Sequence, residues 1–291
     1  MTNSWSLRAL GCAVSVCAGL LAGQARAGCG TASEACSMDS GRYHIVLPPP
    51  DEANNAGTAA PVVMVLHGYG GSGAGVLKMR TMVDGLTQRG YAVIAPTAER
   101  RNGGNRIWVF YPGWEGRDDA AFLRDVVADA ANRFNVSDTR VLLSGFSAGA
   151  FMVNYLACAT PEAYPAYAPV SGGFWRPMPT SCKGPVRLFH THGWRDGVVP
   201  LEGRKLSNGK FEQGDIFAGL EIWRDANGCD GHKPGRTGQS GSFLYRSWNE
   251  CAPGAALQLA LFPGGHQVPK GWADLVLDWF ETQVPDDDTD R

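Results

Sequence analysis

The stretch RVLLSGFSAGAFMVNYLA, residues 140–157, begins with a run that favours a strand and ends with one that favours a helix. Between them stands Gly145-Phe146-Ser147-Ala148-Gly149. A serine between a strand and a helix needs a very tight turn, and the flanking glycines leave room for it. Such a turn lifts the serine hydroxyl above the sheet and turns the amide of Ala148 toward the place where an oxyanion can be bound. A glycine-rich structural turn is the alternative, and the strand–turn–helix setting argues against it.

Short apolar runs and helical patterns alternate along the rest of the chain. Amphipathic helices are expected at Asp118–Phe134 and Trp272–Phe280. The alternation predicts an α/β fold with a doubly wound, mainly parallel sheet flanked by helices. The stretch from Val198 to Gly241 is glycine-rich and irregular, and we expect it to form a lid or an inserted lobe near the site. The expected strands are Arg42–Leu47, Pro61–Leu66, Tyr91–Ala95, Arg140–Ser144, Val186–His192 and Leu257–Phe262.

A second glycine-rich loop, His67-Gly68-Tyr69-Gly70-Gly71, follows the expected strand 61–66. Glycines allow a backbone to approach a substrate closely. In folds with a serine elbow, a second oxyanion donor comes from a loop after an early strand, and the amide of Tyr69 has that position here. His67 is expected to be a structural residue bonded within the loop. A phosphate-binding loop is disfavoured because the Gly-Lys-Ser/Thr ending is missing.

The general base for such a serine is expected to be a histidine, because proton transfer near neutral pH needs a pKa near 7. Of six histidines, His266 follows the last expected strand through the turn Gly264-Gly265 and precedes an amphipathic helix. His190 and His192 lie two apart on one strand. They are expected to be buried and to anchor a loop, since no third metal ligand stands nearby.

The acid that orients this histidine is expected on the loop after strand 186–192. Asp196 is the only carboxylate there before Glu202. The resulting order Ser147, Asp196, His266 is the order that a serine-elbow fold requires. The alternatives are a simple Asp-Gly turn at Asp196 and a role for one of three other acids, Asp215, Glu221 and Asp225.

The first 27 residues are typical of a signal peptide. Arg8 precedes the apolar stretch Ala9–Leu21, and Ala25-Arg26-Ala27 places small residues at a cleavage site near Ala27. The apolar stretch is too short to span a bilayer comfortably. A lipid anchor on Cys29 is disfavoured by Arg26. We therefore expect a secreted or periplasmic protein with a signal peptide at 1–27, one catalytic domain at 28–284 and an acidic tail at 285–291.

The charge and cysteine content exclude some classes of function. The chain has 26 basic and 28 acidic residues, a formal net charge of −2. Without a basic face it is not expected to bind nucleic acid, and no other apolar stretch is long enough for stable membrane insertion. A monomer is expected. Six cysteines remain after the leader and allow 15 connectivities. Pairing of sequence neighbours suggests disulfides Cys29–Cys36, Cys158–Cys182 and Cys229–Cys251, and no Cys-x-x-Cys pair suggests a metal site.

Five motifs together resemble one known family. They are LHGYGGSG (66–73), RVLLSGFSAGAFM (140–152), APVSGG (168–173), HTHGWRDGVVP (190–200) and FPGGHQVPKGW (262–272). The chain resembles, from about residue 43 to 280, the secreted polyhydroxybutyrate depolymerase-like esterases and the feruloyl and acetylxylan esterases of carbohydrate esterase family one. The resemblance implies the α/β-hydrolase fold and a catalytic triad of Ser147, Asp196 and His266, with Tyr69 and Ala148 as oxyanion donors. It implies no cofactor and no metal, and it favours Cys158–Cys182 and Cys229–Cys251.

The resemblance implies a secreted serine carboxylic-ester hydrolase that forms an acyl-enzyme. Its expected substrates are feruloyl or acetyl esters of plant polysaccharide, or hydroxyalkanoate polyesters and oligomers. The alternatives are a peptidase or thioesterase on the same triad and a non-catalytic polymer-binding protein of the cell envelope. Trp114 and Trp194 are the favoured substrate-binding residues. They belong to a larger set of aromatic candidates for a substrate cleft, Trp108, Phe110, Tyr111, Trp114, Trp175 and Trp194.

Overall fold

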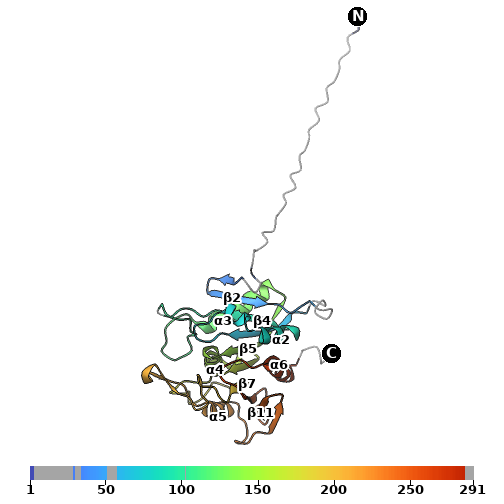
Figure 1. The fold of residues 1–291 in the computed structure, drawn as a ribbon. Coiled ribbons are helices and arrows are strands. Elements are labelled where there is room, and N and C mark those ends of the chain that lie inside the picture. The colour runs from blue at the N-terminus through green and yellow to red at the C-terminus, as the bar shows by residue number, and fades with distance from the viewer. Residues whose placement is uncertain (3–28, 30–33, 51–57, 102, 286–291) are drawn as a thin grey trace.

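A computed structural model describes residues 1–2, 29, 34–50, 58–101 and 103–285 of the chain. Helices lie on both faces of a large twisted sheet (Figure 1). The expected signal peptide, apart from its first two residues, and the acidic tail beyond Pro285 lie outside the described residues. Among the described residues, no helix is both long and apolar enough to cross a membrane.

The elements follow one another in the order expected of an α/β protein. The strands are β1 (Cys36–Met38), β2 (Gly41–Val46), β3 (Ala60–Leu66), β4 (Ala92–Pro96), β5 (Val136–Phe146), β6 (Ala166–Val170), β7 (Arg187–Gly193), β8 (Lys205–Leu206), β9 (Phe211–Glu212), β10 (Arg236–Ser240), β11 (Phe243–Trp248) and β12 (Ala256–Phe262). The helices are α1 (Gly73–Leu77), α2 (Arg80–Gln88), α3 (Asp119–Arg133), α4 (Ala148–Ala159), α5 (Ile216–Ala226) and α6 (Trp272–Gln283), with short 3-10 turns η2 (Pro161–Ala163) and η3 (Ser207–Gly209).

In the described part of the chain, ten strands form one sheet in the order β1-β2-β4-β3-β5-β6-β7-β12-β11-β10. The strands from β4 to β12 in this order pair in parallel. Antiparallel pairs extend the sheet at both edges. The expected doubly wound, mainly parallel sheet is confirmed. Because parallel strands present their carboxyl ends at one edge, the loops after β3, β5, β7 and β12 gather there.

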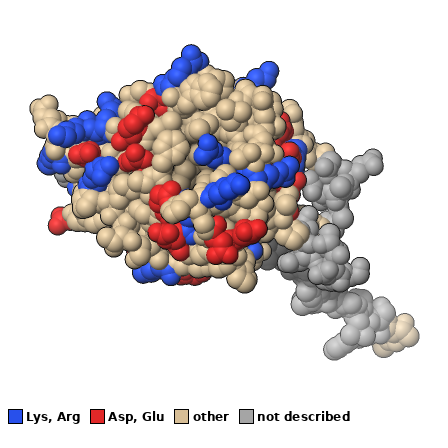
Figure 2. All heavy atoms as spheres, turned by 90° about the horizontal axis from the view of Figure 1, so that it is seen from below, with Lys and Arg blue, Asp and Glu red and all other residues tan. Residues whose placement is uncertain are grey.

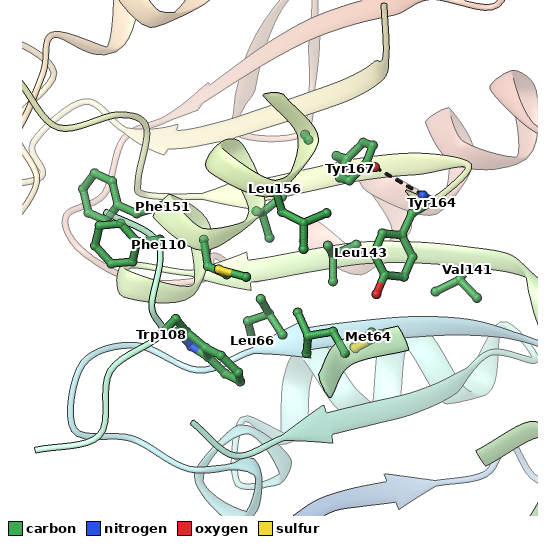
Figure 3. Close-up of a cluster of buried hydrophobic side chains, with 14 of the residues drawn as sticks. Met64, Leu66, Trp108, Phe110, Val141, Leu143, Phe151, Leu156, Tyr164 and Tyr167 are labelled. Atoms are coloured by element: carbon green, nitrogen blue, oxygen red, sulfur yellow. Dashed lines mark hydrogen bonds between the residues drawn. The ribbon is translucent and has the colours of Figure 1, made fainter. Parts of the chain in front are cut away.

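The sheet is buried on both faces, and the sequence of β3 shows why. Successive side chains of a strand point to opposite faces. Val62, Met64 and Leu66 enter the core beneath α3, α4 and α5, whereas Val63 and Val65 enter the core beneath α1, α2 and α6. Figure 3 shows part of the first core, where Met64 and Leu66 lie near Leu143 and Leu156. A strand covered on both sides must be apolar throughout, which is the pattern seen in the sequence.

The irregular stretch from Val198 to Gly241 has two parts. The small β8–β9 hairpin pairs with itself outside the main sheet and borders the cavity described below. The rest belongs to the body of the fold, because α5 packs on the first core and β10 pairs with β11 at the sheet edge. Within this stretch, only the β8–β9 hairpin therefore corresponds to the expected inserted lobe. The three disulfides suggested by sequence proximity, Cys29–Cys36, Cys158–Cys182 and Cys229–Cys251, are all present.

Candidate active site

Ser147 stands on a strained turn between β5 and α4. Its backbone has φ 56° and ψ −117°, a conformation that costs a non-glycine residue roughly 1–3 kcal/mol. The turn is tight because a side chain at Gly149 would collide with the carbonyl oxygen of Leu66, and one at Gly145 would lie 2.5 Å from the carbonyl oxygen of Gly149. This tight strand–turn–helix geometry is the one expected of a nucleophile elbow.

The loop after β3 lies directly against this serine. A Cβ atom at Gly68 would lie 3.2 Å from the Cβ of Ser147. The backbone amides of Tyr69 and Ala148 have no hydrogen-bond acceptor among the described residues. An oxyanion hole requires N–H groups that are free to donate, and these two amides meet that requirement.

His67 holds that loop in place and is not exposed to substrate. Its Nε2 accepts a hydrogen bond from the amide of Ala98 at 3.0 Å, and its Nδ1 donates to the carbonyl of Gly68 at 2.7 Å. The indole of Trp108 donates to the carbonyl of His67 at 2.9 Å. Burial lowers the pKa of His67 to about 4, so the imidazole is neutral. The structural role expected for His67 is confirmed.

Asp196 and His266 meet at the carboxyl edge of the sheet. The Nδ1 of His266 and the Oδ2 of Asp196 are 2.8 Å apart. The imidazole packs on the ring of Phe146, the neighbour of Ser147 in the chain, with 4.6 Å between ring centroids. The two loops are also joined by the amide of Arg195, which donates to the carbonyl of Gly264 at 3.0 Å.

Asp196 is buried yet held in its charged form. Burial alone would raise the pKa of this carboxyl. The hydrogen bond from His266 and the amides of Val199 and Val198 outweigh burial, and the pKa of Asp196 lies below its ordinary value. Those amides donate to Oδ1 at 2.8 and 2.9 Å. The second oxygen of the carboxylate is thereby left to face the histidine.

Two further histidines lie beneath the acid loop. His192 donates from Nε2 to the carbonyl of Val199 at 2.8 Å, so its Nδ1 is free to accept from the Nε2 of His190 at 3.1 Å. Burial lowers the pKa of both histidines, which are fully or almost fully enclosed. They are core residues that anchor the loop of Asp196, as the sequence predicted. Among the described residues, no group of three or more His, Cys, Asp or Glu is placed to hold a metal ion.

The three alternative acids have other partners or positions. Asp215 caps α5 by accepting from the amide of Ala218 at 2.9 Å. Glu221 is paired with Arg224. Asp225 is exposed on α5. Of these three acids and Asp196, it is Asp196 that accepts a hydrogen bond from His266.

A cavity of about 540 Å³ opens beside Ser147 and Ala148. Three of the aromatic residues proposed from sequence line it, Phe110, Trp114 and Trp175. Trp108 is buried against the His67 loop, Tyr111 lies behind the cavity wall against Trp114 and Trp175, and Trp194 is exposed outside the lining. Of the two favoured substrate-binding residues, Trp114 therefore lines the cavity and Trp194 does not.

Two lining aromatics were missed by the sequence analysis. Phe151 follows Ser147 by four residues, which is about one helical turn, and that spacing could have identified it. Phe211 lies in β9, within the stretch that had no regular pattern, and no signal in the sequence singled it out. On the face of the molecule seen in Figure 2, basic and acidic residues are interspersed and form no continuous field of one sign.

Solved structures share this architecture. The acetyl xylan esterase of Aspergillus awamori superposes with a TM-score of 0.60 at 17% identity, over 85% of this chain and 98% of that one. An identity this low carries information about the fold alone. Together with the mostly parallel sheet and the serine elbow, it identifies the α/β-hydrolase fold, as the sequence predicted.

The sequence comparisons point to a narrower group of proteins than the fold does. The model of the esterase PHB depolymerase family matches residues 42–177. Poly(3-hydroxyalkanoate) depolymerase C of Paucimonas lemoignei is 29% identical over 39% of this chain and 28% of its own length. A probable feruloyl esterase C of Aspergillus terreus is 26% identical over 82% of this chain and 83% of its own length. These matches agree with the family resemblance seen in the motifs, and the chain is similar in sequence to esterases of this group.

Proposed function

We propose that the chain is a serine carboxylic-ester hydrolase in which Ser147 is the nucleophile, His266 the general base and Asp196 the acid that orients it. The observation that carries the proposal is the hydrogen bond from His266 to the buried, charged Asp196, with the imidazole packed on Phe146 beside the strained Ser147. A general base needs a partner that fixes its tautomer and stabilises its protonated form, and Asp196 is suited to both.

The proposed reaction has two halves. Nε2 of His266 takes the proton of Ser147 as the serine oxygen bonds to the ester carbonyl carbon, and the amides of Tyr69 and Ala148 bind the resulting oxyanion. When the carbon–oxygen bond to the alcohol breaks, the histidine returns that proton to the leaving oxygen. Water then attacks the acyl-enzyme through the same base and releases the acid and the free serine. These steps use side chains and amides of the chain itself.

The substrates that we propose are feruloyl or acetyl esters of plant polysaccharide, or hydroxyalkanoate polyesters and their oligomers. Support comes from relatives named as feruloyl esterase and poly(3-hydroxyalkanoate) depolymerase, and from the aromatic cavity beside Ser147. A panel of methyl ferulate, acetylated xylan and hydroxybutyrate oligomers, with a peptide and a thioester for comparison, ranks these candidates.

The organisation of the chain is part of the proposal. We infer export of a protein whose signal peptide is cleaved near Ala27 and whose residues 28–284 form one catalytic domain that acts as a monomer. The three disulfides support an oxidising compartment, because such bonds are rare where thiols are kept reduced.

The test is hydrolysis of a short-chain 4-nitrophenyl ester by the purified chain. Ser147→Ala should lower kcat by at least about a thousandfold, because the nucleophile is removed while the fold is kept. Ser171→Ala is the matched control. Ser171 also has a positive φ of 56° at the carboxyl edge of the sheet, but it is fully buried and outside the cavity. Turnover that survives in a folded Ser147→Ala variant would end the assignment.

A further inference from the structure

The cavity beside Ser147 differs in charge from the molecule around it. The whole chain carries a formal net charge of −2. Among the described residues, the cavity lining nevertheless contains two guanidinium groups, those of Arg101 and Arg204, and no Asp or Glu. A concave site with one sign of charge and apolar walls concentrates ligands of the opposite sign.

Arg101 is held at the cavity by an aromatic ring. Its guanidinium carbon lies 4.3 Å from the ring centroid of Trp114, which also lines the cavity. The backbone of Arg101 closes a short turn by accepting from Gly104 and donating to Asn105. No carboxylate in the described part of the chain pairs with its side chain. The ring positions the cation, and no acceptor among the described residues occupies its N–H groups.

Arg204 borders the cavity from the β8–β9 hairpin. Its Nε donates to the carbonyl of Val198 at 2.8 Å, which orients the guanidinium by one edge. Its terminal nitrogens have no carboxylate partner among the described residues. Further along the hairpin, the Nζ of Lys210 lies 5.5 Å from the ring centroid of Phe211, another lining residue. The hairpin therefore adds positive charge at the border of the cavity.

Two other arginines in the same region are neutralised by acids. Arg176 pairs with Glu212 at 3.2 Å, and Arg117 pairs with the buried Asp119 at 2.6 Å. Arg101 and Arg204 line the same cavity as Ser147, and neither forms an ion pair with a carboxylate of the described residues. A guanidinium binds carboxylates through paired N–H groups, and such charge-assisted bonds are the stronger kind.

From this charge pattern we propose that the cavity selects esters that carry a free carboxylate as well as the scissile ester, with Arg101 and Arg204 as the specificity-determining residues. The proposal rests on the proposed function of Ser147. The class includes half-esters of dicarboxylic acids and the free-acid ends of ester oligomers. The carboxylate can stand on the acyl part or on the alcohol part of the substrate, and the experiment separates the two.

The experiment compares matched pairs of charged and neutral esters. On the acyl side, kcat/KM for 4-nitrophenyl hydrogen suberate is divided by kcat/KM for 4-nitrophenyl octanoate. On the alcohol side, 4-acetoxybenzoate is compared with 4-acetoxybenzamide. Each ratio is measured for the parent chain, for Arg101→Gln, for Arg204→Gln and for the double variant. Neighbouring residues outside the lining give matched controls, Arg100→Gln and Lys205→Gln.

Each single variant should lower the charged-to-neutral ratio about fivefold in the arm that places the carboxylate correctly, since one charge-assisted bond is lost. The double variant should lower it further, and the controls should leave it within about twofold of the parent chain. In roughly 1 M salt, where screening acts over about 3 Å, the ratio of the parent chain should fall toward that of the double variant.

Unchanged ratios in both arms for the single and double variants would overturn the inference, provided that the neutral esters are still hydrolysed through Ser147. Failure of the proposed function looks different, because hydrolysis of the neutral esters would then survive Ser147→Ala whatever the ratios are. A fall in either arm supports the inference and identifies the side of the ester that carries the charge.

Discussion

At the scale of single residues, the proposed chemistry depends most on Asp196. A buried carboxylate remains charged only if donors surround it, and here two backbone amides and His266 supply them. The amides occupy one oxygen and leave the other for the imidazole. The pairing therefore orients the histidine with its Nδ1 toward the acid and its Nε2 away from it.

Replacement of this acid by its amide tests its role. Asp196→Asn should lower kcat by about three to four orders of magnitude, because an amide can stabilise neither the required tautomer nor the imidazolium. Asp215→Asn is the control. Asp215 caps α5, and asparagine caps a helix equally well, so turnover should change by less than about twofold. Steady-state kinetics on a 4-nitrophenyl ester gives both values, and the opposite ranking would move the role to Asp215.

At the scale of elements, the loop after β3 depends on a neutral histidine. His67 has a pKa of about 4 in the fold against 6.5 for an exposed imidazole, because it is buried. Between about pH 4 and pH 6.5, the imidazole of His67 binds a proton in the unfolded chain but not in the folded chain. The stability that His67 contributes is therefore complete above about pH 6.5 and is lost as the pH falls toward about 4.

This linkage predicts that the free energy of unfolding depends measurably on pH. The free energy of unfolding should fall by up to about 1.4 kcal/mol per pH unit for His67 within that window. His67→Gln should show a shallower fall than the parent chain in urea unfolding at about pH 7 and about pH 5. His232→Gln removes an imidazole from the surface and serves as the control. A fall of equal steepness in the parent chain and in His67→Gln would contradict the prediction.

The sequence predicts those elements whose pattern is strong. The buried parallel strands are apolar on both faces, and the serine elbow is marked by glycines that nothing larger could replace, so β3, β5, β7 and β12 were expected near their observed positions. The loops after these strands carried the proposed site residues because parallel strands end at one edge.

Elements with mixed or short patterns were not predicted. The helix α2 and the strands β6, β10 and β11 were missed, since Arg236–Ser240 is polar and the five residues of β6 are too few to show a period. The set of cavity-lining residues expected from the sequence was also incomplete. Phe211 and Arg204 reach the cavity from the β8–β9 hairpin. The position of this hairpin depends on tertiary contacts, which no periodicity in the sequence encodes.

At the scale of the whole molecule, the account depends on convergence. Ser147, Asp196 and His266 come from loops after β5, β7 and β12, which are separated along the chain but end at one edge of the sheet. Glycines allow the loops to approach, since a side chain at Gly193 would collide with the carbonyl oxygen of Gly265. The fold thereby brings the loops of the proposed nucleophile and its proposed base to the same edge of the sheet.

The most direct test of this convergence is covalent labelling by a fluorophosphonate, which bonds to a serine whose proton can be removed by an adjacent base. Intact-mass measurement followed by peptide mapping should find one adduct per chain, on the peptide that contains Ser147. The adduct should be absent from Ser147→Ala and formed far more slowly in His266→Ala. Loss of esterase activity with the label on another residue, or an active chain that takes up no label at Ser147, would contradict the account.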